Sequence, residues 1–152
     1  MPTADAVFNN LRGDLPVKLG LTYDDLKHLN EKIVCVHLSA YGRQGERAAW
    51  PGYDYLMQAE CGYLAVTGEP GGPPSRMGLS LVDLSTGLQA AIALSSGILG
   101  ARASGKGGDY DVSLFDAAMA NVCYVASWYM SMGVNTTRCL LYTSDAADDL
   151  VG

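Results

Sequence analysis

The stretch that decides the fold is residues 72–107, which read GPPSRMGLSLVDLSTGLQAAIALSSGILGARASGKG. A turn rich in Gly and Pro leads into a short apolar run, Leu79–Val82, which we expect to be strand-like. After Asp83 the chain carries no charge until Arg102, and its residues follow helical spacing. The positions on this spacing are Leu84, Leu88, Ala91, Ile92, Ser95, Ile98 and Leu99. The pattern predicts a long helix, buried along most of its length, with Asp83 at its start.

Asp83 is therefore a lone carboxylate in apolar surroundings, where charges are rare without a function. Asp is also a favoured helix N-cap, because its carboxylate accepts hydrogen bonds from the first backbone N–H groups. Position alone leaves a reactive role and a capping role open. A membrane span is a further alternative, but the Ser, Thr and Gly residues of the helix make it only weakly apolar and no aromatic belt flanks it. We expect a buried helix of a soluble α/β domain and no membrane association.

Composition sets broader limits. The chain has 152 residues, of which 49% are hydrophobic and 17% charged, as in one globular domain or part of a larger one. The net charge of −6 argues against a general nucleic-acid binder. Cys35, Cys61 and Cys123 stand singly in apolar surroundings without metal-ligand spacing, so we expect buried, reduced thiols and no metal site. No leader-like apolar region is visible in residues 1–14, and a cytoplasmic location is expected.

The C-terminal residues are unusual. Residues 139–148, CLLYTSDAAD, resemble the translation of a transposon-based sequencing adaptor. We expect residues 139–152 to be an adaptor-derived artefact and the native sequence to end near Arg138; the start of the chain also looks cut. A genuine acidic tail is the alternative. Without its three aspartates the net charge would be −3, so no conclusion about partners should rest on the acidic excess.

The remaining elements alternate along the chain. We expect strands over 6–9, 32–40 and 110–113, and helices over 22–30, 51–64 and 114–132. The nearly continuous apolar run Ile33–Val36 is typical of a strand covered on both faces. The Met and aromatic stripe of the last helix is expected to be core. This alternation predicts an α/β fold with a mostly parallel sheet.

Three features invite a functional interpretation and have a simpler one. His37 is expected to be a satisfied core or rim histidine, because no second ligand lies at metal spacing. The glycines around Lys106 follow a helix, so a C-terminal glycine turn explains them better than a phosphate loop. Tyr53 and Asp54 begin a helix, where backbone N–H groups favour an anion, but capping is the alternative.

Five segments, taken in order and spacing, resemble the family III CoA-transferases, which include formyl-CoA and carnitine CoA-transferases and α-methylacyl-CoA racemases. They are NNLRGDLPVKLGLTYDDLKHLN (9–30), LSAYGRQG (38–45), PGYDYLMQAECGYLAVTGEPGGPP (51–74), GLSLVDLSTGLQAAIALSSGIL (78–99) and GKGGDYDVSLFDAAMANV (105–122). The resemblance implies that residues 1–138 are the central part of a Rossmann-like large domain that ends in a long helix.

The resemblance also implies a chemistry. In the transferases of this family an Asp placed like Asp83 is the covalent nucleophile, which attacks an acyl-CoA thioester and passes through an anhydride and an aspartyl-CoA thioester. Coenzyme A and acyl-CoA are then substrates, a carboxylic acid is the acceptor, and no permanently bound cofactor or metal is needed. The implied coenzyme A contacts are Asn10, Leu11, Arg12, Lys18, Pro51, Gly52, Tyr53 and Asp54, and the last two also line the active site.

Two departures from the family affect these expectations. Lys18 stands where the family usually has Arg, which keeps a charge for phosphate but loses the bidentate fork. Tyr53 stands where racemases carry His, and a tyrosine is a poor base near neutral pH, which favours transfer over racemisation.

Racemisation on the same scaffold and a non-catalytic CoA-binding fragment remain alternatives. The full-length parent is expected to be an interlocked homodimer, and this polypeptide alone to be inactive and poorly folded.

Overall fold

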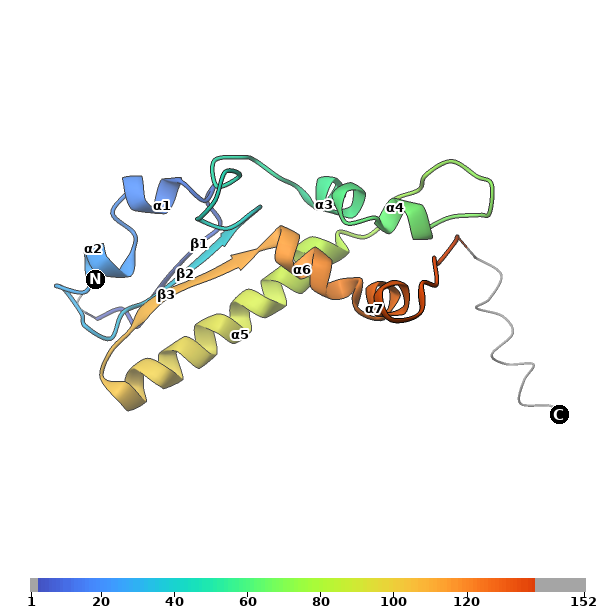
Figure 1. Cartoon of the computed structure of the whole chain (residues 1–152). Helices are drawn as coiled ribbons and strands as arrows, with labels where there is room; N and C mark the ends of the chain where they lie inside the picture. Colours follow the sequence, from blue (N-terminus) through green and yellow to red (C-terminus); the bar gives the residue numbers. More distant parts are fainter. Residues whose placement is uncertain (1–2, 139–152) are drawn as a thin grey trace.

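The centre of the structure is a parallel sheet of three strands in the order β1-β2-β3 (Figure 1). A computed structural model describes residues 3–138; the predicted adaptor tail lies outside the described residues. The strands are β1 (Ala6–Asn9), β2 (Val34–Ser39) and β3 (Gly108–Ser113). In register, Val34 of β2 pairs with Ala6 on one side and Gly108 on the other. The three predicted strands and the α/β class are confirmed.

Helices cover the sheet on both faces. They are α1 (Leu15–Lys18), α2 (Tyr23–Leu26), α3 (Asp54–Glu60), α4 (Tyr63–Val66), α5 (Leu81–Ser104), α6 (Leu114–Asn121) and α7 (Cys123–Met132). α5 runs along one face, where Ala90 and Ala101 pack against Val34 and Val36 (Figure 1). On the other face, Leu26 packs against Cys35. The continuous apolar run of β2 is thus buried from both sides, as predicted.

The long helix differs from its prediction in which residues it buries. α5 begins at Leu81, so the strand-like interpretation of Leu79–Val82 is wrong. Its buried residues are mostly small: Val82, Thr86, Ala90, Gly97 and Ala101. Four of the large residues taken as its buried stripe point outward, with exposures of 60% for Leu84, 68% for Leu88, 66% for Ile92 and 66% for Leu99. Ile98 of the same stripe is partly buried against the core, as predicted.

Close approach to the sheet explains the reversal. A Cβ atom on Gly97 would lie 2.9 Å from Val34 Cγ1 and 2.9 Å from Tyr110 Cε2, so only a glycine fits there without a shift. Small residues let the helix axis come near the sheet and displace the larger side chains to the outer face. By length and composition α5 could also cross a membrane, with a mean hydropathy of 1.3 over 18 residues. Apolar character on both sides is typical of a helix with two covered faces.

Three other predicted helices are shorter or divided. The helix expected over 51–64 is interrupted at Gly62, whose φ of 84° is in the left-handed region. The helix expected over 114–132 is divided at Val122 into α6 and α7. The helix expected over 22–30 is a single turn, and Thr22 caps its start in a capping box.

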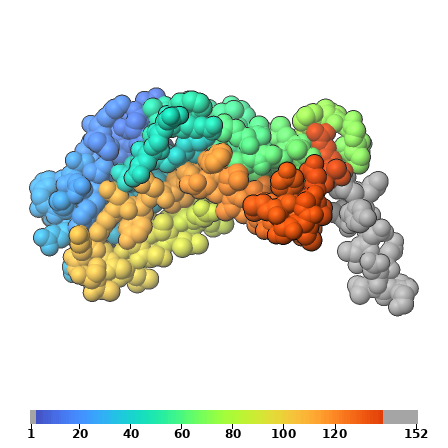
Figure 2. Space-filling view, viewed as in Figure 1, coloured from blue at the N-terminus to red at the C-terminus, as the bar shows by residue number. Residues whose placement is uncertain are grey.

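The stripe of Met and aromatic residues on the last helices is not core. Met119 is 46% exposed, and α7 has no buried residue. The space-filling view shows α7 and the segment after α4 together at the end of the molecule remote from the sheet (Figure 2). Of the cysteines expected to be buried, Cys123 is exposed, whereas burial raises the pKa of Cys35 to about 12.

Two smaller interpretations are confirmed. His37 is 1% exposed and its ring nitrogens contact Asn9 and Asp109, as expected of a satisfied histidine. Gly105 adopts φ 80° and its N–H donates to Ala101 O, which makes it the C-terminal glycine turn of α5.

A glycine next to that turn gives a test of the fold. A Cβ on Gly107 would lie 1.9 Å from the carbonyl oxygen of Ile33, so Gly107→Ala must displace backbone. We expect it to lower the free energy of unfolding by about 3 kcal/mol or more in urea denaturation. Gly100→Ala is the matched control, because Gly100 lies on α5 with no neighbour within 4 Å of the added atom. It should stabilise the chain by up to about 1 kcal/mol; equal effects of the two variants would contradict the packing described.

Candidate active site

A cavity of about 500 Å³ lies at the carboxyl edge of the sheet. Each strand leads to it: Leu11 lies just after β1, Ala40 after β2 and Leu114 after β3, while Asp83 reaches it from α5. Ligands of open α/β sheets bind at this edge. The lining residues are Asn10, Leu11, Arg12, Leu38, Ser39, Ala40, Trp50, Pro51, Gly52, Tyr53, Asp83 and Leu114.

The cavity gathers most of the predicted site residues. Asn10, Leu11, Arg12, Pro51, Gly52, Tyr53 and Asp83 line it, although they come from three distant segments of the chain. Lys18 and Asp54 do not line it. Sequence reasoning missed Ser39 and Trp50; the position of Ser39 at the end of a buried strand was the available signal.

Asp83 is the carboxylate of the cavity. It is the third residue of α5 and is exposed, and its carboxylate has no hydrogen-bond partner among residues 3–138. The capping interpretation is therefore wrong for its side chain, and Ser80 occupies the N-cap position without capping through its own side chain. The pKa of Asp83 is raised, first by partial burial and second by the nearby negative charge of Asp54.

Asp54 caps the helix that carries Asp83. Its Oδ2 atom accepts hydrogen bonds from the backbone N–H groups of Val82 (2.8 Å) and Asp83 (3.2 Å). Asp54 is only 4% exposed and belongs to α3, so the capping carboxylate comes from a different element. Its charge also suits the positive end of the α5 dipole. The structure thus places Asp54 behind Asp83, and the expected position on the active-site wall is not seen.

Gln58 extends this contact to the segment that leads into α5. Its side-chain N–H donates to Asp54 Oδ1 (2.5 Å) and to the carbonyl oxygen of Leu79 (3.4 Å). Its oxygen accepts the N–H of Met77 (2.9 Å). Gln58 is fully buried. Asp54 and Gln58, one turn apart on α3, therefore fix both the start of α5 and the chain before it.

Arg12, on the cavity wall, belongs to a cluster of ion pairs. Arg12 binds Asp14 through two nitrogens, at 2.6 and 3.0 Å, and Lys18 binds the same carboxylate at 2.5 Å. Hydrogen bonds from Arg12 and Lys18 hold the pKa of Asp14 well below its usual range. Asp14 keeps the two cations together, and the cluster of three side chains carries one net positive charge.

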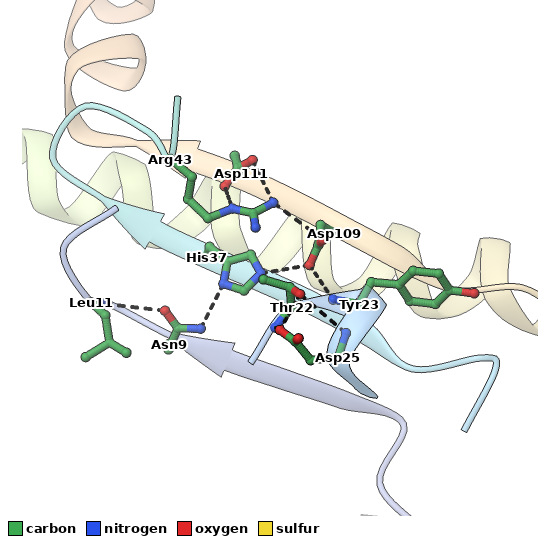
Figure 3. A network of polar contacts seen from close by, with 9 residues as sticks. All are labelled: Asn9, Leu11, Thr22, Tyr23, Asp25, His37, Arg43, Asp109 and Asp111. Atoms are coloured by element: carbon green, nitrogen blue, oxygen red, sulfur yellow. Dashed lines mark hydrogen bonds and ion pairs between the residues drawn. The ribbon is translucent and has the colours of Figure 1, made fainter. Parts of the chain in front are cut away.

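A polar network orders the backbone next to Arg12 (Figure 3). The Asn9 amide nitrogen lies 2.9 Å from His37 Nδ1, and His37 Nε2 lies 2.9 Å from Asp109 Oδ1. The Asn9 oxygen accepts the N–H of Leu11 at 3.5 Å. Because the amide donates to Nδ1, the proton of a neutral His37 belongs on Nε2, facing Asp109.

The other end of the same network is closed by ion pairs and a helix start (Figure 3). Asp109 also accepts the N–H of Tyr23 (2.9 Å), and Arg43 lies 3.6 Å from its second oxygen. Arg43 further binds Asp111. His37 is thus fixed between β1 and β3, and it supports the loop after β1.

Aromatic side chains form the outer rim. Tyr53 is 60% exposed and its ring stacks on Tyr55 at a centroid distance of 5.8 Å. The ring of Trp50 meets Tyr41 edge to face, and the Arg47 guanidinium lies 5.1 Å from its centroid. Among residues 3–138, no three His, Cys, Asp or Glu side chains are grouped as they would be around a metal ion.

Comparisons with known proteins identify a family for this chain. The model of the family described as CoA-transferase family III matches residues 1–140. An acyl-CoA transferase of Fusarium pseudograminearum is 40% identical over 89% of this chain and 30% of its own length. A succinate–glutarate CoA-transferase of Agrobacterium fabrum is 36% identical over 78% of this chain and 30% of its own.

A solved structure shows the same arrangement. The crystal structure of a CAIB/BAIF family protein from Brucella suis superimposes with a TM-score of 0.83 at 31% identity. It matches 90% of this chain and 36% of that chain. The chain therefore spans about a third of the length of the relatives it matches.

The charge of Asp54 should be measurable at Asp83. Asp54→Asn keeps the shape of the side chain and removes its charge, so the pKa of Asp83 should fall toward its ordinary value. NMR titration of the Asp83 carboxyl carbon is the measurement. Asp116→Asn, at the start of α6, removes a charge that is hydrogen-bonded to Ser113 and does not contribute to the shift at Asp83, so the pKa of Asp83 should stay unchanged. An unchanged pKa in Asp54→Asn would show that the two carboxylates are not coupled.

Proposed function

The chain belongs to CoA-transferase family III, and we propose that it is the nucleophile-bearing part of an enzyme that moves coenzyme A from an acyl-CoA thioester to a carboxylic acid. One observation carries the proposal. The carboxylate of Asp83 faces the cavity with no hydrogen-bond partner among the described residues, while its backbone N–H is held by Asp54. A carboxylate with free oxygens and a fixed backbone is suited to attack a bound carbonyl.

The proposed reaction proceeds by nucleophilic substitution at carbonyl carbon. An oxygen of Asp83 attacks the thioester carbon, the C–S bond breaks, and coenzyme A leaves as the thiolate. The thiolate then attacks the Asp83 carbonyl of the mixed anhydride, which releases the donor acid and leaves an aspartyl-CoA thioester. The acceptor carboxylate opens that thioester to a new anhydride, and the returning thiolate forms the product acyl-CoA and frees Asp83.

The surroundings of Asp83 support this role. Only an ionised carboxylate can attack, and a carboxylate with a raised pKa is a more basic nucleophile than an ordinary one. Asp54 contributes to that rise by its charge and, through its hydrogen bonds, keeps the helix start in place. The same side chain therefore has an electrostatic and a positioning effect.

The cluster of Arg12, Lys18 and Asp14 is the proposed site for a phosphate group of coenzyme A. Arg12 uses two nitrogens on Asp14 and retains further N–H donors for an anion. Arg12 is on the cavity wall, and Lys18 binds the same Asp14 carboxylate, which leaves the cluster with a net positive charge. The loop after β1 that carries Arg12 is ordered by Asn9, so the donors are fixed before coenzyme A binds.

Covalent trapping tests the nucleophile. In the parent protein, recovered by amplifying the flanking reading frame, incubation with acyl-CoA and hydroxylamine should modify Asp83, as mapped by peptide mass spectrometry. Asp83→Asn should lower kcat by about 10³-fold or more, because the substituted amide cannot attack. Modification at another residue, or a fully active Asp83→Asn protein, would exclude the proposed nucleophile. Deuterium exchange at the α-carbon of the acyl group without any acceptor acid would instead indicate a racemase.

Coenzyme A binding to the parent protein tests the cationic cluster. Arg12→Gln should weaken binding of coenzyme A by about tenfold in isothermal titration calorimetry, because it removes a charged donor from the cavity wall. The binding should also weaken as salt is raised. Arg102→Gln is the control, since Arg102 lies in the last turn of α5, away from the cavity, where it forms an ion pair with Asp5. If the two variants bind coenzyme A equally well, Arg12 does not contribute to the binding site.

A further inference from the structure

Ser39 has a buried hydroxyl without a partner. The residue is 5% exposed, and its Oγ atom forms no hydrogen bond with any of residues 3–138. A buried polar group left in this state costs stability, and such groups are few in native proteins. The other described hydroxyl of this kind belongs to Thr136, which does not line the cavity. Ser39 ends β2 and lines the cavity with Asp83.

The contrast with Ser113 shows that this state is not imposed by the sheet edge. Ser113 is the register partner of Ser39 on β3 and is 3% exposed. Its hydroxyl accepts the N–H of Asp116 (3.0 Å) and donates to the carboxylate of the same residue (2.6 Å), which caps α6. Two serines thus end neighbouring strands, one bound to a helix start and one unbound beside the cavity.

We propose that the Ser39 hydroxyl is a substrate-binding group, which donates a hydrogen bond to an oxygen of the acyl or carboxylate group bound beside Asp83. This inference rests on the proposed function. Leu38, Ala40 and Leu114 provide no side-chain donor on this part of the wall. A serine hydroxyl reaches three positions by rotation about χ1 and can therefore turn toward a ligand. Thioester carbonyls and carboxylates offer the oxygen acceptors that such a donor requires.

The first experiment compares stability in the parent enzyme. Ser39→Ala removes a hydroxyl that has no protein partner, so the midpoint of urea denaturation should stay the same or rise. Ser113→Ala removes a bound hydroxyl and a helix cap, so its midpoint should fall. A fall in Ser39→Ala as large as that in Ser113→Ala would show that Ser39 has a structural partner and would overturn the inference.

The second experiment compares acetyl-CoA with free coenzyme A, which lacks the acyl oxygen. In calorimetry on the parent enzyme, Ser39→Ala should weaken acetyl-CoA binding by about tenfold and leave coenzyme A binding unchanged. Ser113→Ala should change neither affinity. In the parent enzyme, Ser39→Ala should lower kcat/KM by about tenfold or more, and Ser39→Thr, which keeps the hydroxyl, should recover part of that loss.

The outcomes separate the two proposals. If coenzyme A binds, and Ser39→Ala and the unsubstituted protein bind acetyl-CoA equally well, the role of Ser39 would be overturned. The proposed function would then still stand. Failure of the unsubstituted parent to bind either compound would overturn the proposed function, and the role of Ser39 with it.

Discussion

The hydrogen bonds from the N–H groups of Val82 and Asp83 to the carboxylate of Asp54 are the contact on which the site depends. Ser80 does not cap α5 through its side chain, so the first turn of a 24-residue helix is completed by a residue of α3. Gln58 binds the same carboxylate and the chain before the helix. The position of Asp83 is therefore determined in part by α3, which lies outside its own helix.

The strands could be predicted from the sequence, and the faces of the helices could not. The continuous apolar run of β2 predicts a strand buried on both faces, and the structure shows that burial. α5 has apolar residues all round, and the prediction assigned its interior to Leu84, Leu88 and Ile92, the largest of them. The helix instead packs on the sheet through small residues, Gly97 and Ala101, because they allow its backbone to approach the sheet closely. Helical spacing alone does not tell whether the face of large residues or the face of small residues packs on the sheet.

For the site, the resemblance identified residues that physical patterns could not. Asn10–Arg12 and Pro51–Tyr53 are far apart in sequence, and only the parallel order of β1 and β2 brings their loops to one cavity. Asp54 was expected on the wall because it neighbours Tyr53, but Tyr53 keeps an extended backbone before α3 and is 60% exposed, whereas Asp54 begins the helix and is 4% exposed. Ser39 carries no motif, and its unbound hydroxyl is visible only when the surrounding partners are known.

The arrangement of Asp54 and Asp83 at the start of α5 suits the reactive role proposed for Asp83. A helix start offers a small number of free N–H groups, and a carboxylate that accepts them is stabilised in its ionised form and has fewer oxygens available for attack. Here Asp54 accepts the N–H groups of Val82 and Asp83, and the oxygens of Asp83 have no hydrogen-bond partner among residues 3–138. The charge of Asp54 then adds to partial burial in raising the pKa of Asp83. Had Asp83 capped its own helix, the same dipole that fixes its position would have lowered its basicity. Because Asp54 caps the helix start, the carboxylate of Asp83 is available for the attack that we propose.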